Sequence, residues 1–152
     1  LVLGKGLGGG VLPMAAMLAR EELNVAATRA LGHYTHEKTP LGAAAALAML
    51  DVVETENLIE RSTALGAKTR KQLDELFRDT PIVTEVRGLG LALAVELGQA
   101  DAAERVMYDC LSNGLSFKVS NGNILTLTPP LTITDEEMAR AISILKNAIQ
   151  NI

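Results

Sequence analysis

The chain has 152 residues, 48% of them hydrophobic and 21% charged, a composition typical of a globular domain and not of a disordered segment. Its 14 Lys and Arg residues against 18 Asp and Glu residues give a net charge of −4, and only two Tyr and two Phe are available for stacking on bases. We therefore expect no nucleic-acid partner, because a phosphate backbone requires a basic surface.

The cysteine content and the lengths of the apolar runs bear on the compartment of the protein and on membrane contact. Cys110 is the single cysteine, so no disulfide can form within the chain, and we expect a reducing, cytoplasmic location. No apolar run reaches the roughly 18 residues of a membrane-spanning helix, so we expect no membrane partner. The chain starts inside the apolar run Leu1-Val2-Leu3, which is typical of the end of a buried strand. We expect residue 1 to be an internal position of a longer protein.

The first part of the chain is predicted to be an Ala-rich α/β segment. Residues 4–10 include five glycines, and we expect no regular structure there because glycine loses the most backbone freedom on ordering. Residues 11–19 are predicted as a short strand, and residues 20–28 as a short helix or turn. A helix over residues 41–53 follows Pro40, and its all-apolar face predicts full burial.

The second part combines amphipathic helices with strands. Residues 56–78 are predicted as a long helix, since leucines recur near the 3.6-residue period. The elements expected after it are two strands within 82–97, a helix over 100–113, strands over 115–120 and 123–127, and a last helix. Asn121-Gly122 favours a two-residue hairpin turn between the last two strands. Thr134 and Glu137 have the spacing of a capping box, which predicts where the last helix begins.

The glycine-rich segment is the strongest chemical signal. Gly4, Gly6 and Gly9 formally match the dinucleotide-binding fingerprint, but Val11-Leu12-Pro13 follows them where a helix would be required. A nucleotide- or partner-binding module with a structural glycine loop is therefore one alternative. Lys5 offers another, because an amine among glycines could be desolvated and attack a carbonyl carbon, while the glycines let a planar group approach. The simplest alternative is a solvated loop lysine.

Four segments carry a resemblance to a known family. Leu3–Pro13 resembles the lysine segment of class III pyridoxal-phosphate aminotransferases, in which a Lys precedes a Gly-rich stretch and a Pro. Three further segments resemble the family in the same order: Thr35-His36-Glu37-Lys38-Thr39-Pro40 before an Ala-rich helix, Val86-Arg87-Gly88-Leu89-Gly90-Leu91, and Thr128-Pro129-Pro130-Leu131-Thr132-Ile133. The resemblance covers essentially the whole chain.

The resemblance implies the α/β fold of the aspartate-aminotransferase type (fold type I). Residues 1–54 would end the cofactor-binding large domain, 55–80 would form a linking helix, and 81–152 would form the C-terminal α+β small domain. Lys5 matches the lysine that forms the Schiff base with pyridoxal 5′-phosphate and moves a proton at the substrate Cα. Thr35 matches the threonine that binds the cofactor phosphate of the neighbouring subunit, which implies a homodimer with its active site at the interface.

The resemblance also implies a reaction, the transfer of an amino group, which makes the chain the C-terminal portion of an aminotransferase. The family's other cofactor-binding residues precede the lysine, so we expect these 152 residues alone to be an incomplete enzyme. A lyase, decarboxylase or racemase of the same family is the alternative on the same cofactor.

The substrate position departs from the family pattern. Many family members have an Arg three residues before the first Pro of Pro129-Pro130, where it binds a substrate carboxylate, but this chain has Thr126 there. Arg87 is a second candidate for substrate binding, although a structural ion pair is its simpler interpretation. We expect a substrate without an α-carboxylate, such as an amine, a phosphonate or an ω-amino compound. We expect no metal site, because His33 and His36 lack a third ligand.

Overall fold

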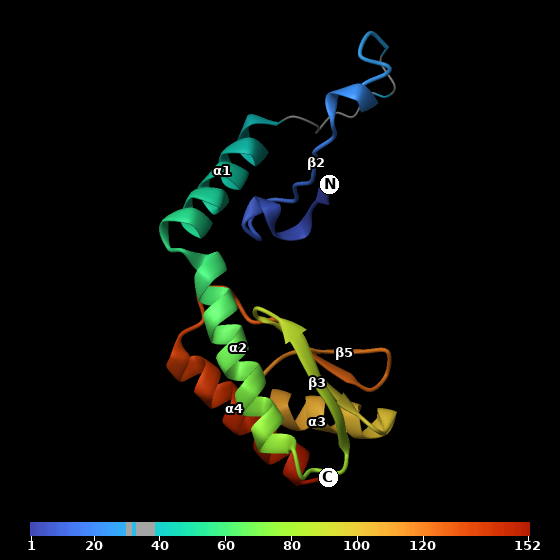
Figure 1. The fold of residues 1–152 in the computed structure, drawn as a ribbon, viewed down its shortest axis with the longest axis vertical. Coiled ribbons are helices and arrows are strands. Elements are labelled where there is room, and N and C mark those ends of the chain that lie inside the picture. The colour runs from blue at the N-terminus through green and yellow to red at the C-terminus, as the bar shows by residue number, and fades with distance from the viewer. Residues whose placement is uncertain (30–31, 33–38) are drawn as a thin grey trace. The chain divides into compact units, whose positions relative to one another are not determined.

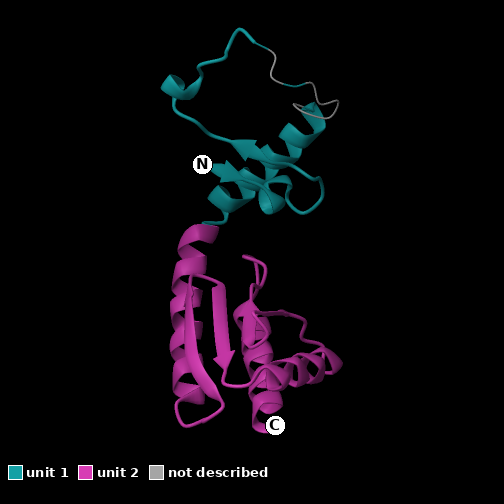
Figure 2. Cartoon of the chain, turned by 90° about the vertical axis from the view of Figure 1, so that its right-hand side faces the viewer, with its two compact units in different colours: residues 1–57 teal, residues 58–152 magenta. Residues whose placement is uncertain are grey.

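The chain forms two compact units, Leu1–Asn57 and Leu58–Ile152 (Figures 1 and 2). The computed structural model describes residues 1–29, 32 and 39–152. Among these residues, no helix combines the length and the apolar character that crossing a membrane requires. The helix α2 (Leu58–Phe77) occupies most of the segment 55–80, where a linking helix is expected, and it lies in the second unit.

Unit 1 contains the glycine-rich segment between two short strands. The strands β1 (Val2–Leu3) and β2 (Ala16–Met17) pair in antiparallel fashion, so the strand expected over residues 11–19 is only two residues long. The 3-10 helix η1 (Lys5–Gly8) follows β1, and η2 (Glu21–Leu23) follows β2. The prediction that residues 4–10 lack regular structure is therefore wrong, because hydrogen bonds between residues three apart close a 3-10 turn.

The helix α1 (Pro40–Thr55) ends unit 1. It begins where expected, because the Thr39 hydroxyl accepts a hydrogen bond of 3.0 Å from the Gly42 N–H and Pro40 occupies the first turn. The prediction of full burial is wrong for this chain, since Leu41 and Leu47 are 68% and 62% exposed. The glycine loop is the main element packed against α1 among the described residues, and it covers only part of the helix surface.

Unit 2 is a four-stranded antiparallel sheet with three helices (Figure 2). The strand order is β3-β4-β6-β5. The strands are β3 (Val83–Leu89), β4 (Ala92–Leu97), β5 (Lys118–Ser120) and β6 (Ile124–Leu127), and the helices besides α2 are α3 (Ala100–Ser112) and α4 (Asp135–Gln150). The strands and helices expected for this part of the chain are therefore present, with ends that differ by a few residues.

The helices cover one face of the sheet. Val95 and Leu125 lie opposite each other on β4 and β6, and both are fully buried. They belong to one hydrophobic cluster with Leu73 of α2, Val106 of α3 and Leu145 of α4. Because all three helices contribute to this cluster, the opposite face of the sheet carries no helix of unit 2. That face is therefore open within unit 2.

The β5–β6 hairpin has a different register from the expected one. Ser120 lies opposite Ile124 and Lys118 lies opposite Thr126, so the loop has three residues and not two. A two-residue turn would have placed Lys118 opposite the buried Leu125. A shift of one residue moves every side chain to the other face of a sheet. The observed register thus places Lys118 on the open face.

Candidate active site

Lys5 has an unusual backbone conformation. Its φ angle is +52°, in the left-handed region that only a few per cent of non-glycine residues adopt. Glycine would adopt this conformation without strain, yet the position carries a long amine side chain. Strained non-glycine residues cluster at functional sites, where the side chain is needed at that point. The backbone therefore supports a chemical role for Lys5.

The glycines beside Lys5 leave room for a planar group. In the described part of the chain, a Cβ at Gly6 would meet no heavy atom within 4 Å, and a Cβ at Gly4 would meet only the Ala15 Cβ at 3.8 Å. Lys5 is exposed, so the described residues do not provide the desolvation expected for its amine. The loop thus fits an aldehyde-bearing ring, because the amine is accessible and no side chain of the neighbouring glycines blocks it.

The segment that follows Lys5 is anchored on α1. A Cβ added at Gly9 would lie 3.7 Å from the Cβ of Met49, in ordinary contact with the helix. Gly42 of α1 is buried, and a Cβ there would approach the Met14 sulfur to 3.3 Å. Both glycines thus let the backbone of the loop and of α1 approach, and η1 packs against α1. The loop backbone is therefore held in place while the Lys5 side chain stays accessible.

Three residues discussed from the sequence lie outside the described residues. Thr35 is one of them, so its phosphate contact stays a prediction, and His33 and His36, from which no metal site is expected, are the others. Thr39 of the same segment is described, and its hydroxyl caps α1. Within the ranges 1–29 and 39–152 and at residue 32, no three His, Cys, Asp or Glu side chains form a group that could hold a metal ion.

The open face of the sheet brings the two expected substrate-binding residues into one row. Arg87 of β3 lies opposite Ala94 of β4, which lies opposite Thr126 of β6. Thr126 in turn lies opposite Lys118 of β5. Residues directly opposite one another project from the same face of a sheet. We call these four residues the polar row.

Arg87 is occupied by two carboxylates. Its Nη1 lies 2.6 Å from a carboxylate oxygen of Glu85 and 2.6 Å from one of Glu96. The hydrogen bond to Glu96 is the main reason why the pKa of Arg87 is raised above its ordinary value. Asn123 donates a further hydrogen bond of 3.4 Å to Glu96. The chain therefore shows the structural ion pair, and an incoming anion at Arg87 would meet two negative charges.

The other end of the polar row carries hydroxyls and an ammonium group. Thr126 donates a hydrogen bond of 2.9 Å to the Ser120 hydroxyl. Lys118 is exposed and forms no ion pair with the described residues. Lys118 and Ser120 are not among the site residues expected from the sequence, and their place on the open face follows from the observed register. The alternation of Phe117 and Val119, which pack against the core, was the signal that places Lys118 on the open face.

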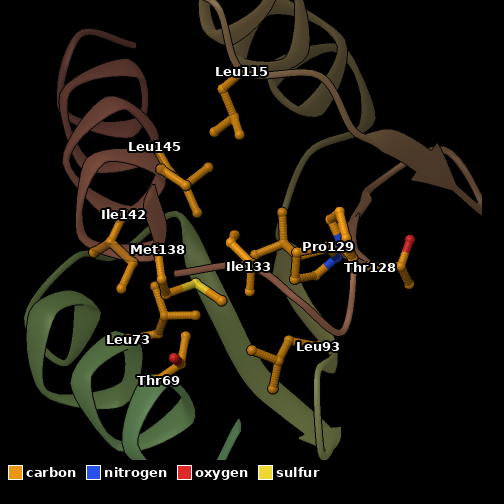
Figure 3. A pocket seen from close by; sticks show the side chains of 13 residues that line it. Thr69, Leu73, Leu93, Leu115, Thr128, Pro129, Ile133, Met138, Ile142 and Leu145 are labelled. Carbon is orange, nitrogen blue, oxygen red and sulfur yellow. The ribbon is translucent and has the colours of Figure 1, made fainter. Parts of the chain in front are cut away.

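The buried side of the sheet contains a cavity of a different character (Figure 3). Its volume is about 180 Å³, and apolar side chains such as Leu73, Leu93 and Met138 line it. Thr69 and Thr128 supply the only hydroxyls among its lining residues. A charged substrate group would lose its hydration there without gaining a partner of opposite charge. The open face is therefore the candidate for substrate binding in unit 2.

Comparison with known proteins places the chain in a family. Residues 1–149 match the family described as Aminotransferase class-III. The chain belongs to the class III aminotransferase family. Enzymes of this family depend on pyridoxal phosphate. The resemblance seen in the sequence is thereby confirmed. The structure also argues against a dinucleotide loop, because the 3-10 turn η1 leads into β2 and not into an α-helix.

The relatives of this family member differ in their chemistry. An (R)-1-hydroxy-2-aminoethylphosphonate ammonia-lyase of Vibrio splendidus strain 12B01 is 46% identical over 100% of this chain and 33% of its own length. The ornithine aminotransferase car2 of Schizosaccharomyces pombe is 37% identical over 100% of this chain and 35% of its own length. The chain therefore spans about a third of the length of these curated relatives.

The solved structures of the family confirm the expected fold. The ornithine aminotransferase of Toxoplasma gondii, reported with partial occupancy of PLP at its active site, matches with a TM-score of 0.92 and 32% identity. The match covers 99% of this chain and 36% of that one. The α/β fold is thus that of the C-terminal third of a class III aminotransferase, of fold type I.

Proposed function

We propose that the full-length protein holds pyridoxal 5′-phosphate covalently through Lys5 and releases ammonia from a small amine that carries a phosphonate group. The family membership supports the cofactor. The relative that is 46% identical over this whole chain is an ammonia-lyase acting on an aminoethylphosphonate, which supports both the reaction and the substrate class.

One observation in the structure carries the substrate assignment. Position 126 holds a threonine on the open face of the sheet, and Arg87, the arginine of the same row, is already paired with Glu85 and Glu96. An arginine binds a planar carboxylate with two parallel hydrogen bonds, which a hydroxyl cannot do. The described face thus lacks an available arginine for an α-carboxylate, which favours a substrate with a different acid group.

The chemistry divides between the cofactor and the protein. When bound, pyridoxal phosphate withdraws electrons from the substrate carbon that carries the amine. The exposed amine of Lys5 is the group of this chain that would hold the cofactor and then move the proton at that carbon. The glycines around Lys5 would admit the ring, and the packing of η1 against α1 would hold the loop.

Transamination is the second candidate. It is favoured by the 37% identity to an ornithine aminotransferase over the whole chain. An assay of the full-length enzyme separates the two candidates. Release of ammonia from 1-hydroxy-2-aminoethylphosphonate without a keto-acid acceptor supports the lyase. Consumption of a keto acid with ornithine, together with no ammonia from the phosphonate, would support the aminotransferase instead.

The role of Lys5 has a test that does not depend on turnover. We expect borohydride reduction of the full-length holoenzyme to fix the cofactor on the peptide that contains Lys5, as mass spectrometry of the digest would show. The Lys5→Ala variant should lose this adduct and the catalytic activity. Lys68→Ala is the control, because Lys68 is an exposed lysine that pairs with Asp135 in unit 2. A reduced adduct on another lysine in the unaltered enzyme would contradict the assignment.

The remaining features of the proposal concern assembly and location. We propose a homodimer in which Thr35 donates a hydrogen bond to the cofactor phosphate of the neighbouring subunit, and a cytoplasmic enzyme acting on a small-molecule amine. The family resemblance supports the dimer and the Thr35 contact. The single cysteine, Cys110, agrees with a reducing compartment.

A further inference from the structure

We infer that Lys118, Ser120 and Thr126 together form the position where the phosphonate group of the substrate binds. The inference deepens the proposed function and rests on it, because the open face contacts a substrate only if the full-length protein acts on one. Lys118 and Thr126 are opposite each other in the ladder, and Ser120 is hydrogen-bonded to Thr126. The three side chains therefore share one face of two adjacent strands.

The charges along the polar row favour an anion at the Lys118 end. Glu85 and Glu96 outnumber Arg87 at the β3 end, so that end carries a net charge of −1. Glu85 lies on β3, three strand spacings of about 4.8 Å from β5, whereas Glu96 lies on β4, two spacings or about 10 Å from β5. Both distances exceed the Debye length of about 8 Å at physiological salt, although the distance of Glu96 exceeds it only slightly. The negative end is therefore partly screened from Lys118, whose ammonium group has no carboxylate partner among the described residues.

The hydrogen-bond donors fit a tetrahedral anion better than a planar one. Thr126 and Ser120 share one hydrogen bond, so one of their two hydroxyl hydrogens is free to point to a ligand. The Lys118 ammonium adds donors from the neighbouring side of the same face, and it acts as a point charge without a preferred plane. Three phosphonate oxygens can accept from such separate donors. A carboxylate prefers the planar fork of an arginine, which Thr126 does not provide.

A structural role for Lys118 is the competing explanation. Lys118 borders a surface hollow that also includes Asp101 and Glu104 of α3. If Lys118 served to attract these carboxylates, its loss would lower the stability of unit 2 and leave ligand binding unchanged. In the structure neither carboxylate lies within ion-pair distance of Lys118. The test below therefore measures ligand affinity and stability separately.

The experiment uses the full-length holoenzyme and two unreactive probes, ethylphosphonate and propionate, which differ only in the acid group. Calorimetry should show that the unaltered enzyme binds ethylphosphonate more tightly than propionate and that added salt weakens the binding. We expect Lys118→Ala to weaken ethylphosphonate binding by about 10-fold or more, as for a lost hydrogen bond to a charged group, and Ser120→Ala to weaken it less. Lys71→Ala, which removes an exposed lysine of α2, should have no effect.

The outcomes separate this inference from the proposed function. Unchanged ethylphosphonate affinity in Lys118→Ala would overturn the binding position, even if the enzyme releases ammonia from an aminophosphonate. The same result with a lowered melting temperature would assign Lys118 to the charge balance of α3. Loss of ethylphosphonate affinity in Lys118→Ala would support the position even in an enzyme that proves to be an aminotransferase, in which case only the reaction type is wrong.

Discussion

The crossing of α2 over the β3–β4 turn makes a sharp prediction for Gly66. A Cβ at this residue would be 2.7 Å from the Gly90 Cα and still closer to the Gly90 carbonyl group. Carbon atoms in contact are about 3.5–4.0 Å apart, and backbone atoms cannot rotate away as a side chain can. The Gly66→Ala variant must therefore separate α2 from the turn and stretch the 3.1 Å hydrogen bond from the Leu91 N–H to the Ser62 hydroxyl.

The expected free-energy change combines three effects. Alanine in place of glycine within a helix would by itself stabilise α2 by about 1 kcal/mol. Overpacking against backbone costs about 1–3 kcal/mol, and the loss of the Ser62 hydrogen bond costs about 1 kcal/mol more. Because a backbone clash lies at the upper end of the overpacking range, we expect Gly66→Ala to lower the free energy of unfolding by about 2–3 kcal/mol.

Urea unfolding of the chain, followed by circular dichroism, measures this change. Ala67→Gly is the matched control, because Ala67 is the next residue of α2 and is exposed. It should lose about 1 kcal/mol, which reports helix propensity without a clash. A Gly66→Ala variant that is more stable than the unaltered chain would show that propensity outweighs the close approach and would refute the reasoning.

Two further predictions concern the titration of unit 2. Two hydrogen bonds from Thr134 lower the pKa of Glu137, the larger effect coming from the Thr134 backbone N–H and the smaller from its hydroxyl. The Glu137 carboxylate therefore stabilises the fold at pH values above its ordinary pKa, and this stabilisation is lost as the pH falls through the lowered pKa. The Thr134→Ala variant should lower the free energy of unfolding by about 1 kcal/mol at neutral pH. In an NMR titration of this variant, the pKa of Glu137 should rise toward its ordinary value. An unchanged pKa of Glu137 would contradict the role of the Thr134 hydroxyl. Burial raises the pKa of the Cys110 thiol from 9.0 to about 11. Because the thiol of the unfolded chain loses its proton at a lower pH, the free energy of unfolding should fall as the pH rises from 9.0 to about 11. The Cys110→Ala variant should not show this fall. A thiol reagent should label Cys110 at pH 8 only after unfolding, and rapid labelling of the folded chain would count against its burial.

Signals contained within a few residues could be interpreted from the sequence. The capping box is present as expected, with Glu137 N–H donating to the Thr134 hydroxyl at 3.1 Å and the Glu137 carboxylate accepting from the Thr134 N–H at 2.8 Å. Both partners lie in one turn of the chain, so nothing distant can change their spacing. The helix α1 likewise begins at Pro40 after its cap Thr39.

Features that depend on distant residues were not predictable in the same way. Asn121-Gly122 indicated a turn correctly, and both residues have positive φ angles, but the turn sequence did not fix the loop length. Asn123 instead bonds with β4, since its side chain donates to the Leu97 carbonyl at 2.8 Å. Leu97 is 26 residues earlier in the chain, so the turn sequence does not indicate this bond. The observed register of β5 on β6, with Asn123 in the loop, places Lys118 on the open face.

The exposure of apolar residues on α1 also depends on parts of the protein that are distant in sequence. An all-apolar helix predicts burial, but the prediction does not say which segment provides the covering surface. Among the described residues, Ala46 is the only buried hydrophobic residue of unit 1, whereas all the others lie in unit 2. The stability of unit 2 is therefore carried by residues of this chain, while Leu41 and Leu47 of α1 still present apolar surface to solvent.

This difference decides which experiments need the full-length protein. The hydrophobic cluster that Gly66→Ala perturbs is complete within unit 2, so unfolding of the 152-residue chain reports on it. Lys5 and its loop pack against an α1 whose apolar surface is largely exposed here, and large exposed apolar patches are typical of surfaces that another element covers. Cofactor attachment at Lys5 must therefore be measured in the full-length enzyme. The Lys118 variants also require the full-length protein, because the ligand proposed for Lys118 is the substrate of the proposed enzyme.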